Sequence, residues 1–197
     1  MNPEKLINFL QSTGQINPQK ATEIAGHFTV KTIRKNEFFL EVGKVSTEYL
    51  FLESGFMRAF AFDPEGRDVT TNFYAANQVV FEVNSFFNRV PAQENMQALT
   101  NCQAWSLTFQ ELNNLFHALP EFREFGRGQL VKGFSALKVR MLATITQTAE
   151  ERYANLLKNH PEILQQAPLK HIATFLGITD TSLSRIRKEF SRPVVGA

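Results

Sequence analysis

The residues whose types and spacing could do chemistry lie in the stretch LKHIATFLGITDTSLSRIRKEF, residues 169–190. Its second half places short hydroxyl side chains and arginines where one helix would gather them on a polar face. Such groups bind the base edges and phosphates of DNA. We expect Thr179 to cap this helix. The residues predicted to contact DNA are Thr179, Asp180, Thr181, Ser182, Ser184, Arg185, Arg187 and Lys188.

The first half of the stretch has the features needed to hold such a helix. Ala173 is small enough for two helices to cross closely, and Gly177 can adopt the left-handed conformation of a sharp turn. Apolar residues at the remaining key positions would close a miniature core: Ile172, Leu176, Ile178, Leu183 and Ile186. The pattern predicts a helix-turn-helix within a C-terminal domain of residues 149–197. An ordinary helical hairpin with a solvated charged face is the alternative.

Composition limits how the chain could bind nucleic acid. The net charge of the 197 residues is only +2, so DNA binding would need a local basic patch. From Pro168 onward there are five basic and two acidic residues, which is such a patch. Cys102 is the single cysteine, so no internal disulfide is expected. The sequence has neither a signal peptide nor a run of 18 apolar residues, and we expect a cytoplasmic protein without membrane contact.

Residues 33–109 have the texture of an all-β domain, and two short helices are expected before it. Asn2-Pro3 and Asn17-Pro18 are each typical of a helix start. The segment Asp63-Pro64-Glu65-Gly66 predicts the turn of a β-hairpin. Many of the 19 phenylalanines fall in this β-rich block, and we interpret them as the aromatic core of a small barrel. Alternation places Phe56, Arg58, Phe60 and Phe62 on one face of a strand.

After Pro120 a helical period returns, and its apolar residues repeat at the 3.5-residue spacing of a coiled coil. The firm part of this seam is Leu130, Phe134, Leu137 and Met141, and Thr144 and Thr148 continue the spacing. We interpret residues 118–148 as a long helix that pairs with a second copy of the chain. Its flanks, Val131, Leu142 and Ile145, are expected to touch the β domain; a purely intrachain helix is the alternative. The segment ERYANLLKNHPEIL is expected to form one further helix.

A β domain, a heptad helix and a helix-turn-helix in this order resemble the Crp/Fnr family of bacterial transcription regulators. The stretch YLFLESGFMRAFAFDPEGRDVTTNFYAANQVVFEV is similar to that family's effector domain, with Gly55 at a strand turn, Glu65-Gly66 at a hairpin tip and Glu82 in its phosphate cassette. The resemblance implies an α+β protein: a cyclic-nucleotide-binding-like double-stranded β-helix (jelly roll) in residues 1–117, a dimerisation helix, and a DNA-binding domain.

The resemblance also implies partners and contacts. These are double-stranded DNA with a palindromic site, a second copy of the chain as a homodimer, and RNA polymerase. In the family, bases are contacted mainly by the first, second and sixth residues after the cap of the recognition helix, which here are Asp180, Thr181 and Arg185. A basic and an acidic residue often occupy the first two positions in the family. Asp180 and Thr181 differ from that pattern and predict a different operator.

The cassette departs from the cyclic-nucleotide-binding members of the family. Their cassette begins Gly-Glu and has Arg followed by Ser or Thr about ten residues later, but here Phe81 replaces the glycine and Ala92-Gln93 replace the later pair. A buried cyclic phosphate without a fixed cation is costly, so neither cyclic AMP nor cyclic GMP is the expected effector. Phenylalanines could fill the space. Otherwise an unknown small-molecule effector would bind near Phe81, Glu82, Arg89, Gln93, Asn95 and Ser135.

Two other classes of function remain as alternatives. A cupin-like metal enzyme would use histidines on adjacent strands, but His27, His117, His160 and His171 are scattered and all lie outside the β block. No nucleophile elbow, phosphate loop or paired-carboxylate motif is evident, so we expect neither catalysis nor a metal or other cofactor. The second alternative is an interaction protein whose helix-turn-helix does not bind DNA.

Overall fold

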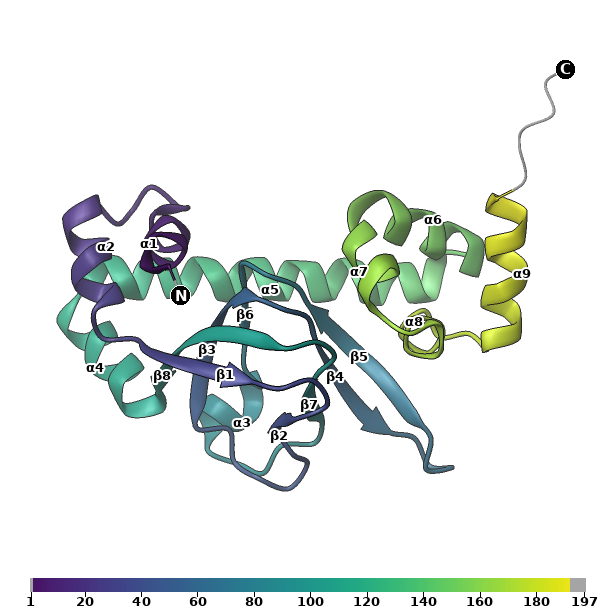
Figure 1. Ribbon diagram of the computed structural model, residues 1–197, viewed down its shortest axis with the longest axis horizontal. Coiled ribbons are helices and arrows are strands. Elements are labelled where there is room, and N and C mark those ends of the chain that lie inside the picture. Colours follow the sequence, from purple (N-terminus) through teal and green to yellow (C-terminus); the bar gives the residue numbers. More distant parts are fainter. Residues whose placement is uncertain (1, 192–197) are drawn as a thin grey trace, which may run out of the picture.

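The computed structural model describes residues 2–191, and residues 192–197 of the predicted C-terminal domain lie outside the described part. A long helix, α5 (Pro120–Thr146), runs along most of the molecule (Figure 1). The β domain lies on one side of it, with N-terminal helices near one end and C-terminal helices at the other. Helices α1 (Pro3–Gln11) and α2 (Pro18–Ala25) begin as predicted, because the side chains of Asn2 and Asn17 accept hydrogen bonds from their first turns.

The β domain consists of two antiparallel four-stranded sheets. One has the order β1 (Thr29–Ile33), β8 (Cys102–Thr108), β3 (Glu48–Ser54), β6 (Gln78–Val80). The other has the order β2 (Phe38–Leu40), β7 (Asn95–Ala98), β4 (Met57–Phe62), β5 (Asp68–Tyr74). This confirms the predicted jelly roll.

The predicted hairpin joins β4 to β5. The Asp63 carboxylate accepts hydrogen bonds from the backbone N–H groups of Glu65 and Arg67 at 3.0 and 2.9 Å. Gly66 has the left-handed φ of +78° that the turn requires.

The interior of the roll is aliphatic, so the prediction of an aromatic barrel core was wrong. Met57 and Ala59 point into it, whereas Phe56 belongs to a cluster shared with the C-terminal helices. Arg58 and Phe60 contact each other outside this interior, and a period of two cannot say which face of a strand is inside. Many of the phenylalanines instead join the roll to its helices. The buried residues of the interior are Ile33, Leu40, Leu50, Leu52, Met57, Ala59, Val80, Ala92, Met96, Ala98, Cys102 and Ala104.

Two helices follow strands of the roll. Within the block expected to be all β, strand β6 ends at Val80 and a short helix, α3 (Val83–Asn88), begins after Glu82. Helix α4 (Phe109–Ala118) starts with a capping box between Thr108 and Glu111. It packs beside the beginning of α5, where Phe122 and Phe125 are buried.

Beyond these two phenylalanines α5 is largely exposed. The expectation that its flanks touch the β domain was wrong, because Val131, Leu142 and Ile145 are all exposed. Arg140 and Ala143 are half-buried in this part of the helix.

Four helices complete the described chain: α6 (Ala149–Asn159), α7 (Pro161–Gln166), α8 (Leu169–Phe175) and α9 (Asp180–Phe190). The single helix expected for residues 151–164 is divided between α6 and α7. Pro161 explains the break because it lacks the N–H donor that a continuous helix would need. None of the described helices is long and apolar enough to cross a membrane.

Candidate nucleic-acid interface and effector site

Helices α8 and α9 are joined by the tight turn that the sequence predicts. Gly177 has a φ of +69°, and the N–H of Ile178 donates to the carbonyl of Ala173 at 3.0 Å. The hydroxyl of Thr179 caps α9 by accepting from the N–H of Ser182 at 3.2 Å. The miniature core that holds the two helices is buried and includes Ile172, Ala173, Leu176, Leu183 and Ile186.

The polar face of α9 is open. Thr181, Ser184, Arg185 and Lys188 follow one another at spacings of three, one and three, so they form one stripe along the helix. All four are exposed, as are Asp180 and Arg187, while Ser182 is half-buried beside the cap. Within residues 2–191, Arg185, Arg187 and Lys188 take part in no salt bridge. Helix α9 lies at the end of the molecule, away from the roll (Figure 1). These cations are therefore available to phosphates or bases.

The seam of α5 is an exposed apolar surface. Leu130, Phe134, Leu137 and Met141 are 40%, 71%, 61% and 48% exposed in the single chain. A phenylalanine and three aliphatic side chains left in water at this spacing are unfavourable, and a second helix would cover them.

The cassette around α3 is held together by its own polar groups. The Glu82 carboxylate caps α3 by accepting from the backbone N–H groups of Asn84 and Ser85. The hydroxyl of Ser85 donates to the Val90 carbonyl at 2.6 Å and accepts from the N–H of Ser46 at 2.8 Å. Glu82 therefore has a structural task in this arrangement.

Arg89 is engaged by the fold as well. It has a left-handed φ of 55° and ends α3, and its guanidinium donates to the Ser46 carbonyl at 2.6 Å. Its Cζ also lies 4.6 Å from the centroid of the Phe109 ring. Ala92 is buried in the roll interior. Its carbonyl accepts a hydrogen bond from the N–H of Gly43, and its N–H donates to the carbonyl of Lys44, both at 2.8 Å. Arg89 is thus engaged by backbone and ring contacts, and the uncharged Ala92 stands at the position of the family's phosphate-binding arginine.

The other effector candidates are distributed differently. Phe81 packs edge-on or tilted against three aromatic rings, those of Tyr49, Phe86 and Phe87. Asn95 is buried and accepts from the N–H of Val42 at 2.9 Å. Gln93 and Ser135 are exposed. Glu82, Arg89 and Phe81 are thus grouped around α3, whereas Ser135 lies on the exposed part of α5.

Two charged residues near the cassette were missed by the sequence interpretation. Burial raises the pKa of Glu94, the Glu82 carboxylate adds to this rise, and a hydrogen bond from Thr71 and the charge of Arg140 oppose it. Arg140 itself donates to the Thr71 carbonyl and lies over the Phe175 ring. No spacing in the sequence would have placed Arg140 of α5 beside Glu94. The neighbouring carboxylates of Glu82 and Glu94 disfavour the binding of an anionic phosphate beside the cassette.

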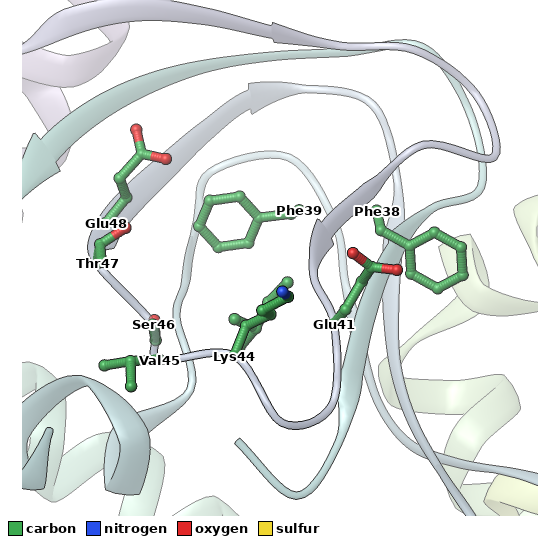
Figure 2. A pocket seen from close by; sticks show the side chains of 9 residues that line it. Phe38, Phe39, Glu41, Lys44, Val45, Ser46, Thr47 and Glu48 are labelled. Atoms are coloured by element: carbon green, nitrogen blue, oxygen red, sulfur yellow. The ribbon is translucent and has the colours of Figure 1, made fainter. Parts of the chain in front are cut away.

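A small cavity of about 160 Å³ lies at the loop between β2 and β3. Figure 2 shows Phe39, Lys44 and Glu48 around it. The Glu48 carboxylate already accepts from Lys31 and Ser106, and none of the effector candidates lines this cavity. Within the described residues, no group of three or more His, Cys, Asp or Glu side chains could hold a metal ion.

Comparison with known proteins identifies the β domain. Residues 30–118 match the model of the cyclic nucleotide-binding domain. No curated protein sequence matches the chain at a significant level.

Solved structures match over most of the chain. FixK2 from Bradyrhizobium japonicum is similar with a TM-score of 0.71 and 17% identity, over 86% of this chain and 89% of that one. A protein described as a transcriptional regulator of the Crp/Fnr family from Eubacterium rectale gives 0.70 and 14%, over 93% and 87%. The c-di-GMP responsive global regulator CLP of Xanthomonas campestris gives 0.68 and 15%, over 90% and 91%. The chain therefore carries a cyclic nucleotide-binding domain and has the fold of the Crp/Fnr-type regulators.

Proposed function

We propose that this protein is a cytoplasmic DNA-binding transcription regulator of the Crp/Fnr type, with RNA polymerase as a further partner. The observation that carries the proposal is the exposed polar stripe of α9. Thr179 caps this helix, and the turn at Gly177 joins it to α8. An isolated stripe of this kind would be an ordinary solvated helix face. Here it belongs to a chain with the fold of known regulators, and this favours DNA as the ligand.

The protein acts as a homodimer on a palindromic site. The exposed seam of α5 supports this assembly, because a two-fold axis along the seam would cover Phe134 and Leu137 of both copies. The same axis would relate the two α9 helices. Two-fold symmetric protein contacts read two-fold symmetric half-sites.

The regulator does not respond to cyclic AMP or cyclic GMP. Two contacts and one residue difference support this part of the proposal: Glu82 caps α3, Arg89 donates to Ser46, and Ala92 stands in place of the phosphate-binding arginine. An effector of another kind, bound near these residues or near Gln93, Asn95 and Ser135, is compatible with the fold.

Selection of sites from a pool of random DNA duplexes tests the proposed function. We expect the wild-type protein to enrich one motif with two-fold symmetry. A variant with Arg185→Ala, Arg187→Ala and Lys188→Ala should enrich none, because it lacks all three basic side chains of α9. Lys35→Ala on the roll is a control that removes an exposed charge far from α9. Failure of the wild type to enrich any motif would refute the proposal and favour an interaction protein.

A further inference from the structure

Helix α8 is joined to the roll by a buried polar contact. Arg58 of β4 donates to Nδ1 of His171 at 2.7 Å and to the carboxylate of Asp68 at 2.9 Å. Arg58 and His171 are only 4% and 5% exposed. The two residues are 113 positions apart in the sequence, and their contact links the roll, which precedes α5 in the chain, to the helices that follow α5. A planar guanidinium suits it because one side chain reaches two acceptors at once.

A second set of contacts surrounds the first. The backbone N–H of Thr70 donates to the hydroxyl of Thr174 at 3.1 Å, and the rings of Phe73 and Phe175 lie 5.1 Å apart. Phe56 and Phe73 of the roll are buried in the same cluster as the core of α8 and α9. Helix α8 lies beside β5 in Figure 1. The DNA-reading unit is therefore docked on the roll.

The long helix contributes to the same junction through Arg140. Its guanidinium donates to the Thr71 carbonyl of β5, and its Cζ lies 4.1 Å from the centroid of the Phe175 ring of α8. The junction thus connects three parts: the β4–β5 hairpin, the helix with the exposed seam, and the helix that carries α9.

The protonation state of His171 suits this arrangement. Burial, and then the neighbouring Arg58 cation, lowers the pKa of His171 to about 4, against the opposing charge of Asp68. Lys170 also lowers this pKa and Asp180 raises it. The ring is therefore neutral near pH 7, and its Nδ1 can accept the hydrogen bond from Arg58. Breaking this bond would leave a buried cation with one partner fewer, which is costly.

We propose that Arg58 and His171 are positioning residues for DNA binding, which fix the direction of α9 relative to the roll and to α5. Neither residue lies on the polar face of α9. They act through α8, whose Ile172 and Ala173 pack against Leu183 and Ile186 of α9. In a dimer, this junction sets the separation of the two recognition helices and thereby the preferred spacing of half-sites. The inference rests on the proposed function.

The test compares variants on duplexes that differ only in half-site spacing. Arg58→Met and His171→Leu should bind the best palindrome about ten-fold more weakly, within the range usual for coupling between sites. They should also lose the wild-type preference for one spacing over palindromes lengthened or shortened by one base pair. Affinity for a duplex with a single half-site should not change, because the residues of α9 are intact.

Matched variants separate positioning from a general loss of structure. His171→Asn keeps an acceptor close to the place of Nδ1 and should restore the spacing preference. His160→Leu changes an exposed histidine and should have no effect. If Arg58→Met does not fold, Arg58→Lys keeps the buried charge but lacks the planar fork, and it should also relax the spacing preference.

Two results have different meanings. Folded Arg58 and His171 variants with wild-type affinity and wild-type spacing preference would overturn this inference and leave the proposed function intact. A wild-type protein that binds no duplex would overturn the proposed function itself.

Discussion

Helix α9 and the cassette around α3 both carry charged side chains, but those of α9 are exposed and those of the cassette are bonded within the fold. On α9, Arg185 and Lys188 are exposed and form no salt bridge within the described residues. Around α3, the charged groups of Glu82 and Arg89 are already bonded to backbone groups of the same domain. A polar side chain binds a ligand well only when that ligand does not have to replace contacts of the fold. The polar groups of α9 are therefore open to a ligand, as the proposed function requires, whereas those of the cassette hold the fold together.

The largest expected effect concerns the seam that would bring two α9 helices together. Leu137→Asp would place an unpaired carboxylate between two helices and should weaken the dimer by several kcal/mol. Analytical sedimentation should then show a monomer, and affinity for a palindrome should fall. Val139→Asp introduces the same charge on the opposite side of α5, where the side chain is 67% exposed, and should leave the dimer intact. A wild-type protein that is monomeric at tens of micromolar, a usual range for such affinities, would contradict this assembly.

The next effect separates two kinds of contact on α9. Arg185→Ala should cost about 1–3 kcal/mol on the selected site and relax specificity at one base pair. Arg187→Ala and Lys188→Ala should weaken all sequences alike and reduce the salt dependence of binding, because phosphates carry no base information. Fluorescence anisotropy on single-base variants of the site measures both. Equal losses on every base variant for Arg185→Ala would exclude base reading by this residue.

The contact between Arg58 of the roll and His171 of α8 predicts that the stability of the protein depends on pH. The pKa of His171 is lowered from 6.5 to about 4 in the folded protein, so the unfolded chain binds the proton more readily. The contribution of His171 to the free energy of unfolding should therefore be fully present above about pH 6.5. It should decrease by about 1–3 kcal/mol as the pH falls toward 4. Other groups titrate in the same range, so the wild type is compared with His171→Asn by urea unfolding. Parallel pH profiles for the two proteins would contradict the prediction.

The smallest effect tests whether Glu82 belongs to the fold. Glu82→Ala removes the cap of α3 and should lower the free energy of unfolding by about 0.5–2 kcal/mol. Glu41→Ala removes a carboxylate from an exposed loop position and serves as the control. Unchanged stability in Glu82→Ala would mean that this carboxylate is available to a ligand, and the contrast with α9 would weaken.

The elements that could be predicted from the sequence are those with local signals. Asn-Pro pairs started both N-terminal helices, Thr179 and Gly177 defined the turn before α9, and Asp63 to Gly66 defined the hairpin. Helix α3 was missed because the apolar run VVF directly before it, at the end of β6, reads as a strand that continues, and the start of α3 depends on the Glu82 cap. The order of β domain, heptad helix and helix-turn-helix came from local patterns and carried the family resemblance, and the comparisons confirm the fold that the resemblance implied.

Contacts between distant residues could not be predicted. Arg58 lies on the outer face of the roll and His171 lies on α8. No pattern in the sequence indicates that these two residues are in contact. The same is true of Arg140 beside Thr71 and Phe175. Such contacts depend on how the roll, α5 and α8 pack together, and a one-dimensional period describes only one element at a time.

The affinity for the selected duplex, measured with and without millimolar cyclic AMP, tests the central claim most directly. We expect the nucleotide-free protein to bind the duplex with an affinity that falls steeply with salt and does not change when the nucleotide is added. Binding that arises only after cyclic AMP is added, and is lost in Glu82→Ala, would contradict it, because the cassette would then be a working nucleotide site that controls α9.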